Sequence, residues 1–205
     1  MDRMYPRLAA RARSAAADGI AAVCIELPGS GGRPRLPGVE QARADLVRAI
    51  SAGAAPSGDV IDRLVLPLVE QAVPEWQATL DQVLALPEIA DRVAISGGLI
   101  AVGVRMAATD PRVVAAGLFA GSYLPQAIIE QAREVTIPLH VLLQWDDEFN
   151  DRQTALDLFD AFGSKEKTLH ANMGGHTGVP PFASEDAARF FVRHLFASQP
   201  AQEGV

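Results

Sequence analysis

Short apolar runs of strand length alternate with segments of helical periodicity along most of this chain. The clearest runs cover residues 92–96, 113–119 and 139–144, with less regular ones at 20–27 and 166–169. Apolar strands in this order are buried only when helices cover both faces of their sheet. The sequence therefore predicts an α/β fold: a mostly parallel sheet of about five strands flanked by helices in three layers.

Segments of helical periodicity precede, separate and follow these runs. No internal repeat or composition shift marks a second domain, so residues 1–197 are predicted to form a single domain, with 198–205 as a flexible C-terminal tail. The expected helices cover 5–17, 39–50, a segment that begins at Pro74 and ends before Pro87, a segment from Gly98 to Thr109, then 127–133, 154–162 and 184–195.

Composition and charge exclude several classes of function. The chain has 205 residues, 49% of them hydrophobic, which is enough for a sizeable buried core. The net charge of −7 disfavours nucleic acid and anionic membranes as partners, since both require a concentrated basic patch. No apolar run is long enough to span a membrane and no signal-peptide pattern begins the chain, so we expect a cytoplasmic protein that acts on a small molecule. The sequence leaves self-association into a homo-oligomer open.

The only cysteine and three of the four histidines are expected to be structural. Cys24 lies inside the apolar run 20–27, which predicts a buried thiol. His140, His170 and His194 follow no metal-ligand spacing, so neither a metal nor a cofactor is expected.

An acidic cluster and a histidine follow two successive predicted strands. Trp145, Asp146, Asp147 and Glu148 come directly after the run 139–144. His176 follows the next run, in a loop whose glycines allow the imidazole to be held out toward a cleft. Because parallel strands place their carboxyl ends at one edge, the acid and the histidine are expected to form the base-and-orienter half of a catalytic triad. Asp147 is the favoured acid and Asp146 the alternative, whereas Asp151 is expected to cap the following helix.

Four segments of the C-terminal third carry a resemblance to a known family: QWDDE at 144–148, KEKTLHAN at 165–172, GGHTGVP at 174–180 and DAARFFVRHL at 186–195. The chain resembles the α/β-hydrolase family over residues 19–195, in particular its small cap-less branch of dienelactone-hydrolase-like and esterase-like members. The resemblance implies an α/β-hydrolase-like fold, with Asp147 as the triad acid and His176 as the general base.

The family's nucleophile elbow, G-x-S-x-G on a strand-to-helix turn, is degenerate here. In one register Ser96 is the nucleophile and the N–H group of Gly97 supplies one oxyanion donor. In the other register, residues 97–101 form the elbow and Leu99, which cannot attack a carbonyl, takes the nucleophile's place. Both registers remain open. The strand and glycine-rich loop that precede the first helix in the family, and that donate half of the oxyanion hole, have no counterpart in this sequence.

Two further residues are candidates for substrate contact. Trp145, beside the acid, either lines the pocket or packs under the loop. Ser30, in the glycine-rich segment 28–32, either contacts a ligand or belongs to a plain turn.

The sequence thus supports two functions. The first is a serine hydrolase of small carboxylic esters, lactones or thioesters. The second is a catalytically degenerate protein on the same fold that binds a ligand or catalyses a non-hydrolytic isomerisation. A serine activated by His176 distinguishes the first from the second.

Overall fold

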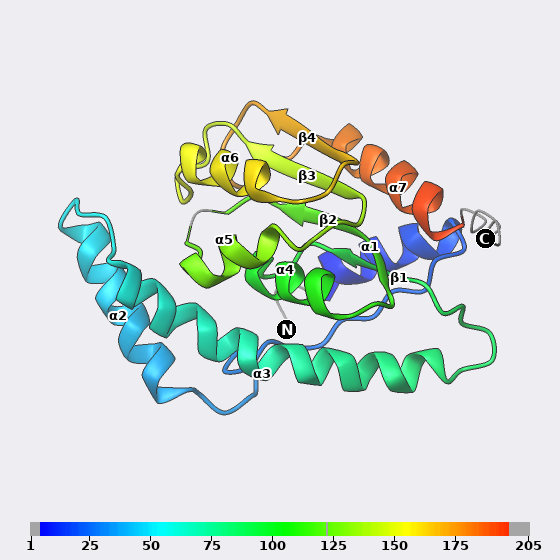
Figure 1. Ribbon diagram of the computed structural model, residues 1–205, viewed down its shortest axis with the longest axis horizontal. Coiled ribbons are helices and arrows are strands. Elements are labelled where there is room, and N and C mark those ends of the chain that lie inside the picture. Colours follow the sequence, from blue (N-terminus) through cyan, green and yellow to red (C-terminus); the bar gives the residue numbers. More distant parts are fainter. Residues whose placement is uncertain (1–4, 122, 197–205) are drawn as a thin grey trace, which may run out of the picture.

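A computed structural model describes residues 5–121 and 123–196, and its centre is a parallel sheet (Figure 1). The sheet has four strands in the order in which they occur along the chain, with helices against both of its faces. This arrangement confirms the predicted fold class. The tail predicted at 198–205 lies outside the described residues. The strands are β1 (Val93–Ser96), β2 (Val113–Phe119), β3 (Leu139–Gln144) and β4 (Lys167–Asn172).

The strand register brings the carboxyl ends of β3 and β4 to the same place. Each strand pairs with the next one in parallel, and the β3–β4 ladder runs to the last residue of both strands, where Gln144 pairs with Asn172. Leu139, Val141 and Leu143 of β3 are each about 1% exposed, as expected for a central strand covered on both faces. The loops that follow β3 and β4 therefore begin side by side.

Helices α4 (Ile100–Thr109), α5 (Gln126–Ala132) and α6 (Arg152–Ala161) lie over one face of the sheet, and α7 (Pro181–Leu195) lies over the other. Glycines permit close contact on both faces. A Cβ atom at Gly103 would lie 2.9 Å from a methyl group of Leu118, and one at Gly117 would lie 2.6 Å from the ring of Phe191. The strand-to-helix order thus places the buried apolar residues of the sheet between layers of helices.

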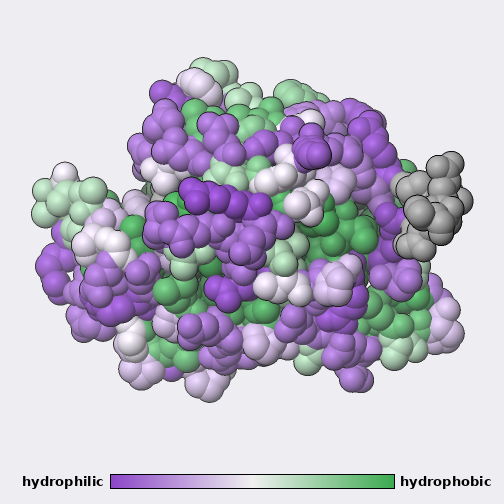
Figure 2. Space-filling view, viewed as in Figure 1, coloured by the Kyte–Doolittle hydropathy of each residue, from purple (hydrophilic) through white to green (hydrophobic). Residues whose placement is uncertain are grey.

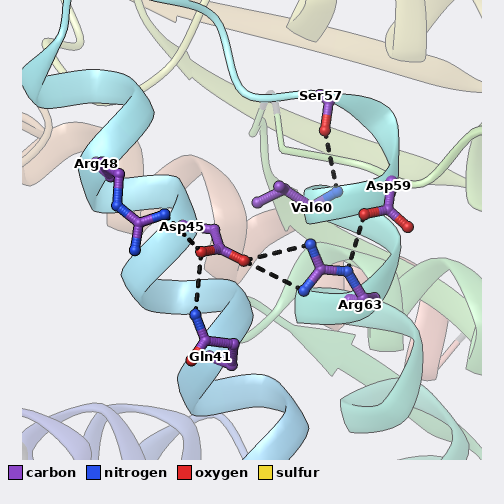
Figure 3. A network of polar contacts seen from close by, with 7 residues as sticks. All are labelled: Gln41, Asp45, Arg48, Ser57, Asp59, Val60 and Arg63. Atoms are coloured by element: carbon purple, nitrogen blue, oxygen red, sulfur yellow. Dashed lines mark hydrogen bonds and ion pairs between the residues drawn. The ribbon is translucent and has the colours of Figure 1, made fainter.

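Helices α2 (Pro37–Ser51) and α3 (Gly58–Leu84) form a hairpin that projects beside the sheet (Figure 1). Figure 3 shows a polar network between them, in which Asp45 accepts hydrogen bonds from Gln41, Arg48 and Arg63. Ser57 caps α3 by accepting from the N–H group of Val60. The arginines of this network are exposed and Asp45 is half-buried, so these ion pairs contribute little to stability.

Helix α3 is longer than the sequence predicted. It runs for 27 residues and continues through Pro67 and Pro74, although we expected a helix to begin at Pro74. Each proline removes one backbone donor, but the buried face of α3, which includes Val69 and Leu80, packs against the core and offsets that loss. Figure 2 shows apolar residues over the C-terminal end of α3. No helix among the described residues is long and apolar enough to cross a membrane.

The strand predicted at residues 20–27 does not form. This segment is irregular, its residues 21–24 are exposed, and in the described part of the chain β1 pairs with β2 alone. Apolar and β-branched residues favour a strand only when a neighbouring strand accepts their backbone hydrogen bonds, and no strand of the described sheet pairs with this segment. The thiol of Cys24, predicted to be buried, is exposed for the same reason. The preceding helix α1 (Tyr5–Ala17) forms as predicted, but buries none of its residues.

Candidate active site

Two loops at the carboxyl edge of the sheet carry the predicted acid and histidine. We call residues 145–150, after β3, the acid loop, and residues 173–179, after β4, the histidine loop. Backbone hydrogen bonds continue the pairing of the strands into the loops: the N–H of Trp145 donates to the carbonyl of Asn172 at 2.8 Å, and that of Asp146 to the carbonyl of Gly174 at 3.2 Å. The strand ladder therefore fixes the two loops against each other.

This arrangement brings Asp147 and His176 together. The Oδ2 atom of Asp147 lies 2.8 Å from Nδ1 of His176, and the carboxylate also accepts hydrogen bonds from the side chain of Asn150 at 2.8 Å and the N–H of Phe149 at 2.9 Å. The Asp147 side chain is 3% exposed, whereas that of His176 is 42% exposed. The buried acid thus lies behind an imidazole that solvent and a substrate can reach.

The ionisation of Asp147 follows from these contacts. Burial raises the pKa of Asp147, but the hydrogen bonds from Asn150, His176 and Phe149 together outweigh burial and hold that pKa below its ordinary value. Asp147 is therefore a carboxylate at neutral pH and accepts the proton on Nδ1 of His176. With that proton on Nδ1, Nε2 is the acceptor atom that a general base requires.

Two aromatic rings hold the imidazole of His176. Phe119, the last residue of β2, meets it at a centroid distance of 5.3 Å, and Phe149 of the acid loop meets it at 5.5 Å; both contacts are edge-to-face. Edge-to-face contacts of this kind restrict ring rotation. Phe149 is 60% exposed, so it also presents an apolar surface next to the imidazole.

The other acidic residues of this region have different partners. Asp146 bonds to the backbone of Gly174 through its own N–H and, at 3.4 Å, through Oδ2. Glu148 accepts the backbone N–H of His176 at 3.0 Å, a contact that nothing in the sequence pattern indicated. Asp151 caps α6 by accepting from the N–H of Thr154, as predicted.

Ser96 is the last residue of β1 and is exposed. Its hydroxyl oxygen accepts a hydrogen bond from Nη2 of Arg11 at 3.1 Å, and no hydrogen bond among the described residues joins it to His176. The turn from β1 into α4 is formed by Gly97 and Gly98, whose φ angles are +67° and +82°, and Leu99 then caps α4. No described residue other than glycine has a positive φ, so neither Ser96 nor Leu99 adopts the strained conformation of an elbow nucleophile.

Gly97 does not offer the oxyanion donor that the sequence predicted. Its N–H group donates to the carbonyl of Gly117 at 2.8 Å, because the β1–β2 ladder extends one residue beyond Ser96. A donor committed to the sheet cannot also bind a developing oxyanion.

The two candidates for substrate contact lie in different places. Trp145 is 36% exposed at the start of the acid loop, and the guanidinium of Arg152 covers its ring at 4.2 Å. The hydroxyl of Ser30 donates to the carbonyl of Leu27 at 2.7 Å, which is a turn contact. Ser30 also lines a cavity of about 230 Å³ between its loop and α2.

The remaining histidines pack between the sheet and α7. His140 is 3% exposed, and its ring lies 4.3 Å from that of His170 and 5.5 Å from that of Phe190. Burial, with a smaller contribution from His170, lowers the pKa of His140 to about 4. His194 lies 4.6 Å from the ring of Phe190. Among the described residues, no group of three or more His, Cys, Asp or Glu side chains is placed to hold a metal ion.

The parallel sheet flanked by helices is a fold that this chain shares with esterases of known structure. A PEG-bound cold-adapted esterase from an Arctic intertidal metagenomic library is 26% identical and superposes with a TM-score of 0.68, over 90% of this chain and 74% of that chain. The native structure of a cold-adapted esterase from such a library is 30% identical over 62% of this chain and 60% of that chain, with a TM-score of 0.58.

A more distant esterase, Pf2001 of Pyrococcus furiosus, is 10% identical and has a TM-score of 0.52 over 60% of this chain and 61% of that chain, a likeness of fold alone. No protein family and no curated protein matches the sequence. The esterase-like part of the resemblance is therefore supported by structure, whereas the dienelactone-hydrolase-like branch stays a prediction.

Proposed function

We propose that this protein hydrolyses small carboxylic esters, with lactones and thioesters as related substrates. The observation that carries the proposal is the 2.8 Å contact between a buried, ionised Asp147 and an exposed His176, in a fold shared with esterases. An imidazole whose Nδ1–H is held by a carboxylate is a general base at Nε2, and ester hydrolysis requires such a base.

In the proposed reaction Ser96 is the nucleophile. As Oγ of Ser96 bonds to the ester carbonyl carbon, its proton passes to Nε2 of His176, and Asp147 stabilises the imidazolium. The tetrahedral intermediate expels the alcohol, which takes that proton and leaves an acyl-serine. Water then repeats the sequence, giving the carboxylic acid and free Ser96. No cofactor takes part in these steps.

Arg11 is compatible with this role of Ser96. The guanidinium uses an acceptor lone pair of the hydroxyl, so the hydroxyl proton stays available for transfer to His176. Since Gly97 donates to the sheet, we assign the oxyanion to the next backbone N–H groups, those of Gly98 and Leu99 at the turn into α4. Donors at a helix N-terminus favour developing negative charge.

A second candidate function is proton transfer to or from a bound ligand without a covalent step. The turn formed by Gly97 and Gly98 favours it, because in this turn no side chain occupies the strained position from which an elbow nucleophile attacks. Asp147 and His176 would then act as a general base in an isomerisation.

Turnover of p-nitrophenyl acetate by the wild type and three variants separates these functions. We expect His176→Ala and Ser96→Ala each to lower kcat by at least about a thousandfold, because the nucleophile and its base act as one unit. The matched control is Ser184→Ala, an exposed serine of α7. If His176→Ala loses turnover but Ser96→Ala does not, the covalent mechanism through Ser96 is refuted. Wild-type turnover in both variants would refute the roles of His176 and Ser96, and absence of turnover in the wild type would refute the hydrolase proposal itself.

A further inference from the structure

Gln144, the last residue of β3, and Glu148 of the acid loop hold one peptide bond of the histidine loop at both ends. The N–H of His176 donates to Oε2 of Glu148 at 3.0 Å, and the carbonyl of Gly175 accepts from Nε2 of Gln144, also at 3.0 Å. That carbonyl and that N–H belong to the same peptide unit. With the bond from Asp147 to the imidazole, three residues from a five-residue segment of the chain hold His176.

One of the two groups of this clamp is a buried amide and the other is a carboxylate. Gln144 is 1% exposed, and its Oε1 atom has no hydrogen-bond partner among the described residues. Burying this amide costs free energy, and the bond that Nε2 donates to the carbonyl of Gly175 offsets part of that cost. Hydrogen bonds from its own N–H and from the N–H of His176 hold the pKa of Glu148 below its ordinary value. Glu148 is therefore an ionised acceptor at neutral pH, and charge-assisted bonds of this kind are the stronger ones.

The histidine loop is shaped to admit the clamp. A Cβ atom at Gly175 would lie 2.6 Å from Oε2 of Glu148, so a side chain there would displace the carboxylate from its present position. The N–H of Gly178 adds a second bond, at 2.8 Å, to the carbonyl of Gly175. The peptide before His176 is thus fixed in orientation, and with it the direction of the Cα–Cβ bond that carries the imidazole.

We propose that Glu148, together with Gln144, is a positioning residue for His176: it fixes the Gly175–His176 peptide so that Nε2 keeps its orientation while Nδ1 is held by Asp147. The expected effect of Glu148 on catalysis rests on the proposed function, whereas the hydrogen bonds that hold the Gly175–His176 peptide do not depend on it. Misplacement of a catalytic group by a fraction of an ångström lowers the rate without changing how the substrate binds.

The test compares Glu148→Ala, which removes the acceptor, with Glu148→Gln, whose amide oxygen can still accept the N–H of His176. We expect Glu148→Ala to lower kcat for p-nitrophenyl acetate about tenfold with KM within twofold of wild type, and Glu148→Gln to recover most of that loss. The control, Glu88→Ala, removes an exposed glutamate in the loop between α3 and β1. Equal kcat in Glu148→Ala and wild type, or equal losses in the alanine and glutamine variants, would overturn the proposal.

A second measurement separates positioning from hydrolysis. The proton shared by Nδ1 of His176 and Asp147 gives a downfield proton NMR resonance, which we expect to broaden or shift in Glu148→Ala and to persist in Glu148→Gln. If the wild type hydrolyses no ester, this resonance still tests the clamp, and an unchanged resonance in Glu148→Ala would refute it. Should Glu148→Ala fail to fold, Gly175→Ala serves instead, because its Cβ displaces the carboxylate but leaves the charge. A folded Gly175→Ala protein with an unchanged resonance would refute the clamp equally.

Discussion

At the scale of the residue, Asp147 determines which ring nitrogen of His176 can act as a base. Its carboxylate is buried, accepts three hydrogen bonds and stays ionised, so the imidazole keeps its proton on Nδ1 and exposes Nε2. The neighbouring Asp146 has a similar place in the sequence but bonds to the backbone of Gly174 instead. Which of two adjacent carboxylates meets the histidine depends on side-chain direction within the loop, which the sequence pattern does not determine.

Replacing Asp147 with asparagine tests this role. The introduced amide group would donate to Nδ1 of His176 and force the imidazole proton onto Nε2, so we expect Asp147→Asn to lower kcat for ester hydrolysis by about 10³–10⁴-fold. Steady-state kinetics measures the loss, and Asp157→Asn, at an exposed site on α6, is the control. A loss of less than about tenfold in a folded Asp147→Asn protein would show that this carboxylate does not orient the histidine.

At the scale of the element, strands 113–119 and 139–144 could be predicted to the residue, since each is an apolar run between clear helix and turn signals. The segment 20–27 is also an apolar run but forms no strand, because an apolar run does not show whether a neighbouring strand will pair with it. Likewise, Ser96 could be identified as the end of a strand. Its hydrogen bond from Arg11 of α1 could not be predicted, because it joins residues 85 positions apart and no sequence pattern indicates it.

The turn between β1 and α4 gives a prediction at this scale. Gly98 has a φ angle of +82° and open space around its Cα, so a side chain there is strained by the backbone alone. We expect Gly98→Ala to lower the free energy of unfolding by about 1–2 kcal/mol, measured by urea denaturation. Gly58→Ala is the matched control, because Gly58 also has open space but no positive φ. Equal stability of Gly98→Ala and wild type would contradict the left-handed turn.

At the scale of the whole molecule, the sheet and α7 enclose a titratable group away from the site. His140, in β3, could be predicted to be structural because it lies in an apolar run. Its contacts with His170 and Phe190 could not be predicted, since they depend on how β4 and α7 pack against β3. Asp186 of α7 also faces these histidines, with its carboxylate 3.7 Å from Nδ1 of His170.

Stability should therefore fall on mild acidification. The pKa of His140 is about 4 in the folded chain, against about 6.5 unfolded, so between these values the unfolded state binds more protons. The free energy of unfolding then decreases as pH falls from 6.5 to 4, by up to about 1.4 kcal/mol per pH unit from this group. Urea denaturation of His140→Leu across that range should show a shallower dependence on pH. An identical slope in wild type and variant would assign the acid sensitivity to other groups, such as His194, whose pKa burial also lowers.

The proposed reaction depends on whether His176, held by Asp147, activates Ser96. Labelling with a fluorophosphonate probe followed by peptide mapping tests this directly, because the probe reacts with activated serines and reports the residue that attacked. We expect one adduct on Ser96 in the wild type and none in His176→Ala. A well-folded protein that remains unlabelled, or that carries its adduct on another residue, would contradict the serine mechanism and favour proton transfer by Asp147 and His176 alone.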